Sequence, residues 1–363
     1  MTRVMMALPE LDVGGAQILT LNLIREIRKK TPDIQFQILV LEAPHGTYLE
    51  EQCRQEEIDV VYLGKGKGFS PWIIPKIIRA IKGFNPDVIH MHKSRLHYFL
   101  LPILLSGVKK RLYTVHNLAD RDTQNKWVRK LVAFSFCYCG VIPIAISELC
   151  RKSIVETYGL CVGAVPCIYN GIDVAKFINP ERQNKQKSEK FRIISVGRLS
   201  KQKNYPLLLC TAKKAHSQWP ELEFFILGDG EQRRSLEDQI KRESEGSYVH
   251  LVGNVDNVHQ YLWNADVFLM TSDYEGLPLT VLEAMAAGLP IISTKAGGVA
   301  DVVQEGRNGF LVDCHDEDGL VSALGKLCDD PKLCASFSKE SEMLSKQYSL
   351  ESMAAQYLKI YLE

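Results

Sequence analysis

The chain has 363 residues, of which 46% are hydrophobic and 24% are charged, and its formal net charge is +1. These values predict a globular protein, long enough for two domains of about 150 residues each, and they give no support to nucleic-acid binding. The apolar stretch before Pro9 is too short for a signal-peptide core or a spanning helix, so we expect a cytoplasmic protein without a transmembrane anchor.

The charge is unevenly distributed along the chain. Up to Pro180 there are 23 Lys and Arg against 16 Asp and Glu, and beyond it 21 against 27. A basic first half can face an anionic substrate or an anionic membrane surface, which makes peripheral contact with the inner face of the cell membrane a further hypothesis. Chance scatter of solvated charge is the alternative.

In the first half, short apolar runs rich in β-forming residues alternate with amphipathic stretches. The runs cover residues 34–41, 59–63, 86–92, 110–117 and 142–147. Continuous apolar strands separated by helices predict a parallel sheet that is covered on both faces.

Two glycines, Gly14 and Gly15, stand directly before an amphipathic helix expected to start near Ala16. Backbone N–H groups at a glycine-lined helix start can approach a phosphate closely, and the helix dipole favours the negative charge. An ordinary turn is the alternative. The chain has neither G-x-G-x-x-G here nor a P-loop motif, which argues against a dinucleotide oxidoreductase and a P-loop NTPase.

Histidines and cysteines raise the question of a metal site. His90, His92 and His97 resemble a ligand cluster, but Lys93 and Arg95 lie between them, so we expect no metal there. The ten cysteines include no CxxC pair, which favours reduced packing residues. The Asp-x-Asp pair formed by Asp316 and Asp318 precedes a helical run, and helix capping is the favoured interpretation.

His116 ends one of the expected strands. A histidine at that position can hydrogen-bond a sugar hydroxyl or stabilise developing charge, and a structural hydrogen bond is the alternative. Residues 121–136 follow and combine basic and aromatic side chains. They can form an amphipathic surface helix that contacts a membrane, although Trp127, Phe134 and Phe136 can equally belong to the core.

Residues 179–190 are polar and lack an apolar period, so they are predicted to link residues 1–178 to a second domain over 191–345. Apolar runs restart there, at 191–198, 222–230, 248–253, 266–272, 289–294 and 309–313. The sequence therefore predicts two Rossmann-like, doubly wound α/β domains facing a cleft. Residues 346–363 are predicted to form a final helix. Its apolar periodicity does not show which domain the helix packs against.

Arg198 and Lys203 follow the first strand of the second half, in the loop at its carboxyl end. Two cations five residues apart can clamp a diphosphate, the Arg through its forked donors and the Lys as a point charge. An exposed basic loop is the alternative.

The segment YEGLPLTVLEAMAAGLPIIST, residues 274–294, places two glutamates around a helix start. Glu275 lies in a loop after an expected strand, and Glu283 lies one turn inside the helix. The free N–H groups near Leu279 and Thr280 favour an anion. Carboxylates accept hydrogen bonds from sugar hydroxyls, so one glutamate can hold a sugar and the other a ribose. Solvated surface glutamates are the alternative.

Taken together, these motifs resemble the retaining nucleotide-sugar glycosyltransferases of the GT-B fold, in particular glycosyltransferase family four, over nearly the whole chain. The most specific part is the pair of glutamates separated by seven residues, Glu275 and Glu283. The supporting parts are Gly14-Gly15, HN at His116, NGID at 170–173, GRLSKQKN at 197–204 and GDG at 228–230.

The resemblance implies a metal-independent hexosyltransferase that needs no cofactor. Arg198 and Lys203 would bind the donor diphosphate, with Gly14, Gly15, Gly228 and Gly230 lining the donor site. Leu279 and Thr280 would belong to the same site, Glu283 would hold the nucleotide ribose, Glu275 the donor sugar, and His116 would lie beside the transferred sugar. In this family, retention is usually explained by front-face attack in which the leaving phosphate takes the acceptor proton.

UDP is expected as the donor nucleotide more than GDP, and the expected acceptor is a lipid-linked oligosaccharide of surface polysaccharide biosynthesis. Two other functions remain open. A nucleotide-sugar 2-epimerase has a similar two-domain fold, but it would consume the donor without an acceptor. A non-catalytic sensor would bind the donor without releasing nucleotide.

Overall fold

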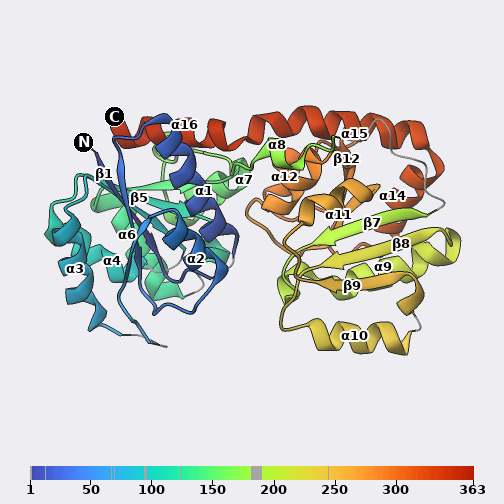
Figure 1. Ribbon diagram of the computed structural model, residues 1–363, viewed down its shortest axis with the longest axis horizontal. Helices are drawn as coiled ribbons and strands as arrows, with labels where there is room; N and C mark the ends of the chain where they lie inside the picture. Colours follow the sequence, from blue (N-terminus) through green and yellow to red (C-terminus); the bar gives the residue numbers. More distant parts are fainter. Residues whose placement is uncertain are drawn as a thin grey trace. The chain divides into compact units, whose positions relative to one another are not determined.

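The structure is a computed structural model that describes residues 2–12, 14–66, 68, 70–93, 96–123, 125–180, 190–243 and 245–363. The chain divides into two compact units (Figure 1). Unit 1 comprises Met1–Gly171 and Leu350–Glu363, and unit 2 comprises Ile172–Ser349. Of the expected linker, residues 181–189 lie outside the described part of the chain.

Unit 1 contains a parallel sheet of six strands in the order β3-β2-β1-β4-β5-β6. The strands are β1 (Arg3–Leu8), β2 (Gln35–Val40), β3 (Asp59–Tyr62), β4 (Val88–His92), β5 (Lys110–Val115) and β6 (Val141–Ala145). The helices are α1 (Gly15–Lys30), α2 (Tyr48–Gln55), α3 (Ile73–Phe84), α4 (Leu96–Ser106), α5 (Ala119–Asp122), α6 (Lys126–Tyr138), α7 (Glu148–Tyr158) and α16 (Leu350–Leu362).

Unit 2 repeats this architecture with the order β12-β11-β10-β7-β8-β9, again all parallel. Its strands are β7 (Phe191–Val196), β8 (Leu222–Leu227), β9 (Val249–Gly253), β10 (Val267–Met270), β11 (Ile291–Thr294) and β12 (Gly309–Val312). Its helices are α8 (Val174–Phe177), α9 (Tyr205–Gln218), α10 (Arg233–Arg242), α11 (Val258–Asn264), α12 (Leu279–Ala286), α13 (Val299–Val302), α14 (Glu317–Asp329) and α15 (Pro331–Ser345).

Each unit has the strand order of a doubly wound dinucleotide-binding fold, so the predicted fold class is confirmed. The central strand of unit 1, β1, is absent from the expected strands. Its sequence, RVMMAL, has a single β-branched residue, and its neighbours β2 and β4 supply the pairing that makes it a strand.

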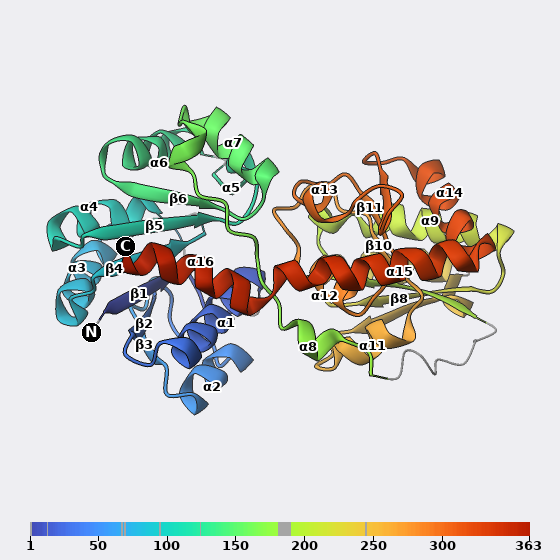
Figure 2. The ribbon, with the colours of Figure 1, turned by 90° about the horizontal axis from the view of Figure 1, so that it is seen from above.

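The C-terminal helix α16 packs on unit 1, where it contacts α1 (Figure 2). Lys110 Nζ binds the carbonyl oxygen of Ile360 at 2.7 Å, and His90 Nδ1 lies 2.6 Å from the hydroxyl of Tyr361. The first unit also ends earlier than the predicted boundary at residue 178. Residues 172–178 belong to unit 2, where α8 contacts α11 and α12.

No helix in the described ranges combines the length and the hydropathy needed to cross a membrane. All ten cysteines are free.

Candidate functional site

Each sheet reverses its winding direction between two central strands, β1 and β4 in unit 1 and β7 and β10 in unit 2. In doubly wound folds, ligands bind at the carboxyl ends of the strands at this reversal. The loops that follow these four strands are therefore where the site residues are sought, and each unit is described separately.

In unit 2 an ion pair joins the loops after β7 and β10. Lys203 Nζ lies 2.8 Å from Glu275 Oε1, and the two side chains are only 15% and 9% exposed. The structure thus brings together two of the predicted site residues that are 72 positions apart. An ion pair with so little solvent access is sensitive to the loss of either partner, because the remaining charge stays desolvated.

Hydrogen bonds between the same two loops hold this pair in place. Gln202 Nε2 donates to the carbonyl oxygen of Tyr274 at 2.8 Å, and Asn204 Nδ2 donates to Asp273 Oδ1 at 2.8 Å. The hydroxyl of Thr271 donates to the carbonyl oxygens of Lys203 and Asn204, each at 3.1 Å. Lys203 is therefore anchored on both sides, which orients it before any ligand binds.

Glycines allow the surrounding loops to approach closely. A Cβ at Gly228 would clash with the carbonyl oxygen of Gly197, and one at Gly230 would clash with that of Leu199. A Cβ at Gly297 would clash with the carbonyl oxygen of Glu275. Gly228 and Gly230 therefore have a packing role, since they bring the GDG turn against the loop that carries Lys203.

Arg198 does not join the ion pair. It is exposed, and its Nε lies 3.5 Å from Oε2 of the exposed Glu231. Within the described part of unit 2, Lys203 is thus the cation that the fold holds beside Glu275, and Arg198 keeps its freedom to reorient.

The helix α12 starts at Leu279, with Pro278 as its N-cap. The N–H of Val281 binds the carbonyl oxygen of Pro278, and the described residues supply no acceptor for the N–H groups of Leu279 and Thr280. These two donors fit the expected anion-binding helix start. Gly288, with φ of 73°, follows the end of the helix.

Glu283, one turn inside α12, is partly buried. Burial raises the pKa of Glu283 above 4.5 and the charge of Lys176 partly offsets this increase, so that the resulting pKa is about 7. Protonated Glu283 therefore stabilises the folded state. This contribution is fully present below pH 4.5 and is lost as the pH rises through about 7.

Replacement of Glu283 by Gln should therefore change how stability depends on pH. We expect the free energy of unfolding of Glu283→Gln, relative to the wild type, to rise by ~1–3 kcal/mol between pH 5 and pH 8, because glutamine never carries the buried charge. Urea denaturation at both pH values measures this difference, with Glu231→Gln as an exposed control. An equal difference at the two pH values would contradict the assignment.

Unit 1 has an analogous ion pair that the sequence analysis missed. Lys93 Nζ, after β4, lies 2.7 Å from Oε1 of Glu10, after β1, and both side chains are partly buried. Lys93 has a positive φ of 61°. The one signal in the sequence is that Lys93 directly follows β4 and Glu10 lies two residues beyond β1, the strands that flank the reversal of the sheet. The strand β1 itself is not predicted.

The glycines Gly14 and Gly15 form the start of α1, with Gly14 as its N-cap. A Cβ at Gly14 would lie 2.8 Å from Oε1 of Gln17, whose Nε2 lies 3.3 Å from Oε1 of Glu10. The glycine pair is thus adjacent to the Glu10–Lys93 ion pair at the same end of the sheet.

His116 follows β5 and is partly buried, with its Nε2 2.9 Å from Nδ1 of His92. Burial and, to a smaller extent, the charge of Lys93 lower the pKa of His116 to about 3. His90 and His92 are buried on β4, and His97 lies on α4. Among the described residues, no group of three or more His, Cys, Asp or Glu is placed to hold a metal ion.

Asp316 caps α14 by accepting from the N–H of Gly319, which confirms its predicted role.

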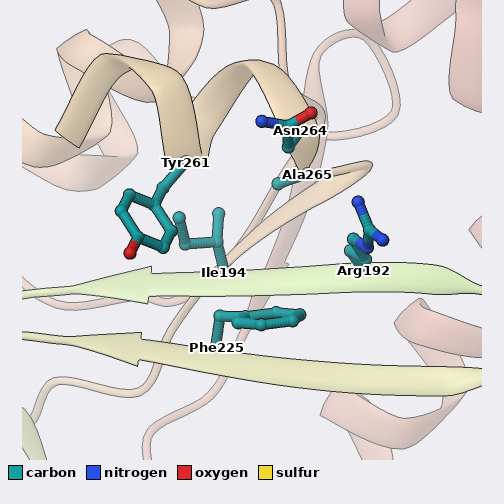
Figure 3. Close-up of a pocket in the computed structure, with 6 residues that line it drawn as sticks. All are labelled: Arg192, Ile194, Phe225, Tyr261, Asn264 and Ala265. Atoms are coloured by element: carbon teal, nitrogen blue, oxygen red, sulfur yellow. The ribbon is translucent and has the colours of Figure 1, made fainter. Parts of the chain in front are cut away.

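A cavity of about 340 Å³ lies elsewhere in unit 2 (Figure 3). The lining residues are Arg192, Ile194, Phe225, Tyr261, Asn264 and Ala265. Arg192 and Ile194, the lining residues on β7, precede the carboxyl end of that strand. None of the predicted site residues lines this cavity.

Known families match both units. Residues 13–176 match the family described as Glycosyltransferase Family 4, and residues 177–343 match Glycosyl transferases group 1. The 2-deoxystreptamine N-acetyl-D-glucosaminyltransferase of Niallia circulans is 30% identical over 302 residues, covering 76% of each chain.

Two further proteins are similar. The Escherichia coli UDP-Gal:alpha-D-GlcNAc-diphosphoundecaprenol alpha-1,3-galactosyltransferase is 29% identical over 272 residues, covering 71% of this chain and 70% of the relative. The crystal structure of Anabaena HepE with UDP-glucose shares the fold, with a TM-score of 0.84, 19% identity and coverage of 99% of both chains. On the strength of both family matches and these relatives, the chain belongs to glycosyltransferase family four and is a glycosyltransferase of the GT-B fold.

Proposed function

We propose that this enzyme is a retaining, metal-independent hexosyltransferase that uses a UDP-sugar, in preference to a GDP-sugar, and transfers the sugar to a lipid-linked oligosaccharide. The observation that carries the proposal is the partly buried Lys203–Glu275 pair at the sheet reversal of unit 2. The UDP-glucose bound to HepE supports UDP as the donor nucleotide. The diphosphoundecaprenol acceptor in the name of the E. coli relative supports a lipid-linked acceptor.

Lys203 and Glu275 have complementary roles in this proposal. Breaking the sugar–phosphate bond leaves positive charge at the anomeric carbon and negative charge on the diphosphate. The ammonium of Lys203 has three N–H donors, so those not directed at Glu275 remain available to the leaving diphosphate. The carboxylate of Glu275 accepts hydrogen bonds from hydroxyls of the donor sugar.

The remaining predicted residues of unit 2 bind the donor around this pair. The N–H groups of Leu279 and Thr280 receive the diphosphate, Glu283 accepts from the ribose, and Arg198 adds a second, mobile cation. Gly228 and Gly230 shape the loop that carries Lys203. In unit 1, the Gly14-Gly15 start of α1 contributes phosphate-binding N–H groups, and His116 donates a hydrogen bond to the transferred sugar.

A lipid-linked acceptor requires access to a membrane, and α6 offers a surface for this contact. Four large side chains with helical spacing are exposed along it: Trp127, Leu131, Phe134 and Tyr138. The exposed Lys126 and Lys130 accompany them, whereas Phe136 is buried. The neighbouring α4 (Figure 2) adds three exposed leucines, Leu101, Leu104 and Leu105. Apolar side chains flanked by lysines fit the interface of an anionic bilayer.

Removing two aromatic rings from this surface should weaken membrane binding. We expect Trp127→Ser together with Phe134→Ser to lower binding to phosphatidylglycerol vesicles at least about tenfold, because each buried ring contributes roughly 1–2 kcal/mol. Vesicle co-sedimentation measures the effect. Trp72→Ser, which removes an exposed aromatic ring outside α6, is the matched control. Unchanged binding of the double variant would rule out this surface.

The proposed activity is tested by incubating the purified protein with a panel of UDP- and GDP-sugars, without added metal, in the presence or absence of lipid-linked acceptors. We expect a UDP-sugar to stabilise the protein against unfolding. We also expect UDP to be released only when the acceptor is present, and the product to retain the anomeric configuration of the donor. Consumption of the donor without an acceptor would identify a 2-epimerase, and stabilisation without nucleotide release would favour a sensor.

A further inference from the structure

Four polar side chains form a ladder on one face of the unit 1 sheet. His90 and His92 are two residues apart on β4, and Thr114 and His116 are two residues apart on β5 and beyond its end. His92 is paired in register with Thr114, yet the hydrogen bonds run diagonally. His90 Nε2 lies 2.7 Å from Oγ1 of Thr114, and His92 Nδ1 lies 2.9 Å from Nε2 of His116.

The helix α16 holds the inner end of this ladder. The hydroxyl of Tyr361 lies 2.6 Å from Nδ1 of His90, and the hydroxyl of Tyr357 lies 3.2 Å from Oγ1 of Thr114. Both nitrogens of His90 are thus paired with hydroxyls, and its ring lies against that of His92 with 4.1 Å between centroids. His92 is consequently confined to one orientation.

The two nitrogens of His92 differ in their surroundings. Nδ1 meets His116, whereas Nε2 is buried and has no hydrogen-bond partner among the described residues. Burial lowers the pKa of His92 well below 6.5 and that of His116 to about 3, so both rings are neutral and carry one N–H each at neutral pH.

Two proton arrangements satisfy the bond between the rings. If His116 donated through Nε2–H, His92 would carry its own proton on the buried Nε2, and that N–H would have no acceptor. If His92 donates through Nδ1–H, the buried Nε2 is only an unpaired acceptor. Orphaned buried N–H groups are rarer than unpaired acceptors, so the second arrangement is favoured.

We infer that His92 is a positioning residue that donates its Nδ1–H to His116 Nε2, so that His116 carries its own proton on Nδ1 and offers this N–H to a hydroxyl of the donor sugar. The second half of this inference rests on the proposed function. A neutral donor suits the reaction, because an imidazolium next to the anomeric carbon would oppose the positive charge that develops there.

The position of the proton is measured directly in the wild-type enzyme. With ¹⁵N-labelled histidine, long-range ¹H–¹⁵N correlation spectra distinguish the two tautomers, and the signals missing from His116→Gln identify His116. We expect His116 to be protonated at Nδ1. Protonation at Nε2 would overturn the inference, and this result does not depend on activity.

The positioning role is tested with two variants of His92. His92→Phe cannot donate, so we expect a mixture of His116 tautomers and a kcat that falls about tenfold, with donor KM changed less than about threefold. His92→Asn places an amide near the original Nδ1, and it should restore both the tautomer and kcat. An unchanged tautomer and kcat in His92→Phe would refute the role.

The two proposals fail in different ways. If His116 has the expected tautomer but His116→Gln transfers sugar at the wild-type rate, the assignment of His116 in the proposed function fails while the proton position stands. If the enzyme transfers no sugar at all, the tautomer measurement still decides whether His92 is the donor.

Discussion

Lys203→Ala is expected to lower kcat at least about a hundredfold, equivalent to a few kcal/mol of transition-state stabilisation. The physical reason is that Lys203 is the cation held at the sheet reversal of unit 2, beside Glu275 and anchored by the loops on both sides. Steady-state kinetics with the UDP-sugar selected by the donor panel measure the loss. Lys201→Ala, which removes an exposed lysine from the same turn, is the matched control and should retain nearly full activity.

Glu275→Ala is expected to lower kcat to a similar extent. However, Lys203→Ala and Glu275→Ala each also leave the charge of the other residue desolvated and unpaired. Breaking such a pair costs about 3–5 kcal/mol where burial is complete, and less here because the side chains keep some solvent access. Lys203→Met combined with Glu275→Leu separates the two effects. We expect the double variant to recover stability, measured by urea denaturation, while turnover stays low. Near-wild-type turnover in any of these variants would remove the residue concerned from the site.

The second large effect is expected at Gly297, whose φ is 59°. A Cβ at this position would clash with the carbonyl oxygen of Glu275, so the loop that carries Glu275 would have to move. We expect Gly297→Ala to lower the free energy of unfolding by about 3 kcal/mol or more, combining backbone strain with overpacking, and to reduce activity by displacing Glu275.

Gly306→Ala is the control that separates strain from the clash. Gly306 has a similar φ of 71°, but a Cβ there would meet no atom within 4 Å. Only the backbone strain applies, which costs roughly 1–2 kcal/mol. Urea denaturation and kcat of both variants make the comparison. Equal losses would mean that the contact with Glu275 has no separate effect.

Much of the architecture was accessible from the sequence because it is encoded locally. Apolar runs separated by amphipathic stretches predicted the two doubly wound domains, and the motif from Glu275 to Glu283 identified the glycosyltransferase resemblance. The strand β1 was missed because its sequence has little intrinsic β-preference and is a strand through its pairing with β2 and β4.

The sequence by itself determined which residue types follow the strands of each unit, including Lys203, Glu275 and His116. Only the tertiary structure decided which of them meet. Lys203 pairs with Glu275, Lys93 pairs with Glu10 and His92 pairs with His116 across neighbouring strands, while Arg198 stays exposed. The reason is that a parallel sheet brings the carboxyl ends of its central strands together regardless of their separation along the chain, and strand order is a property of the whole fold.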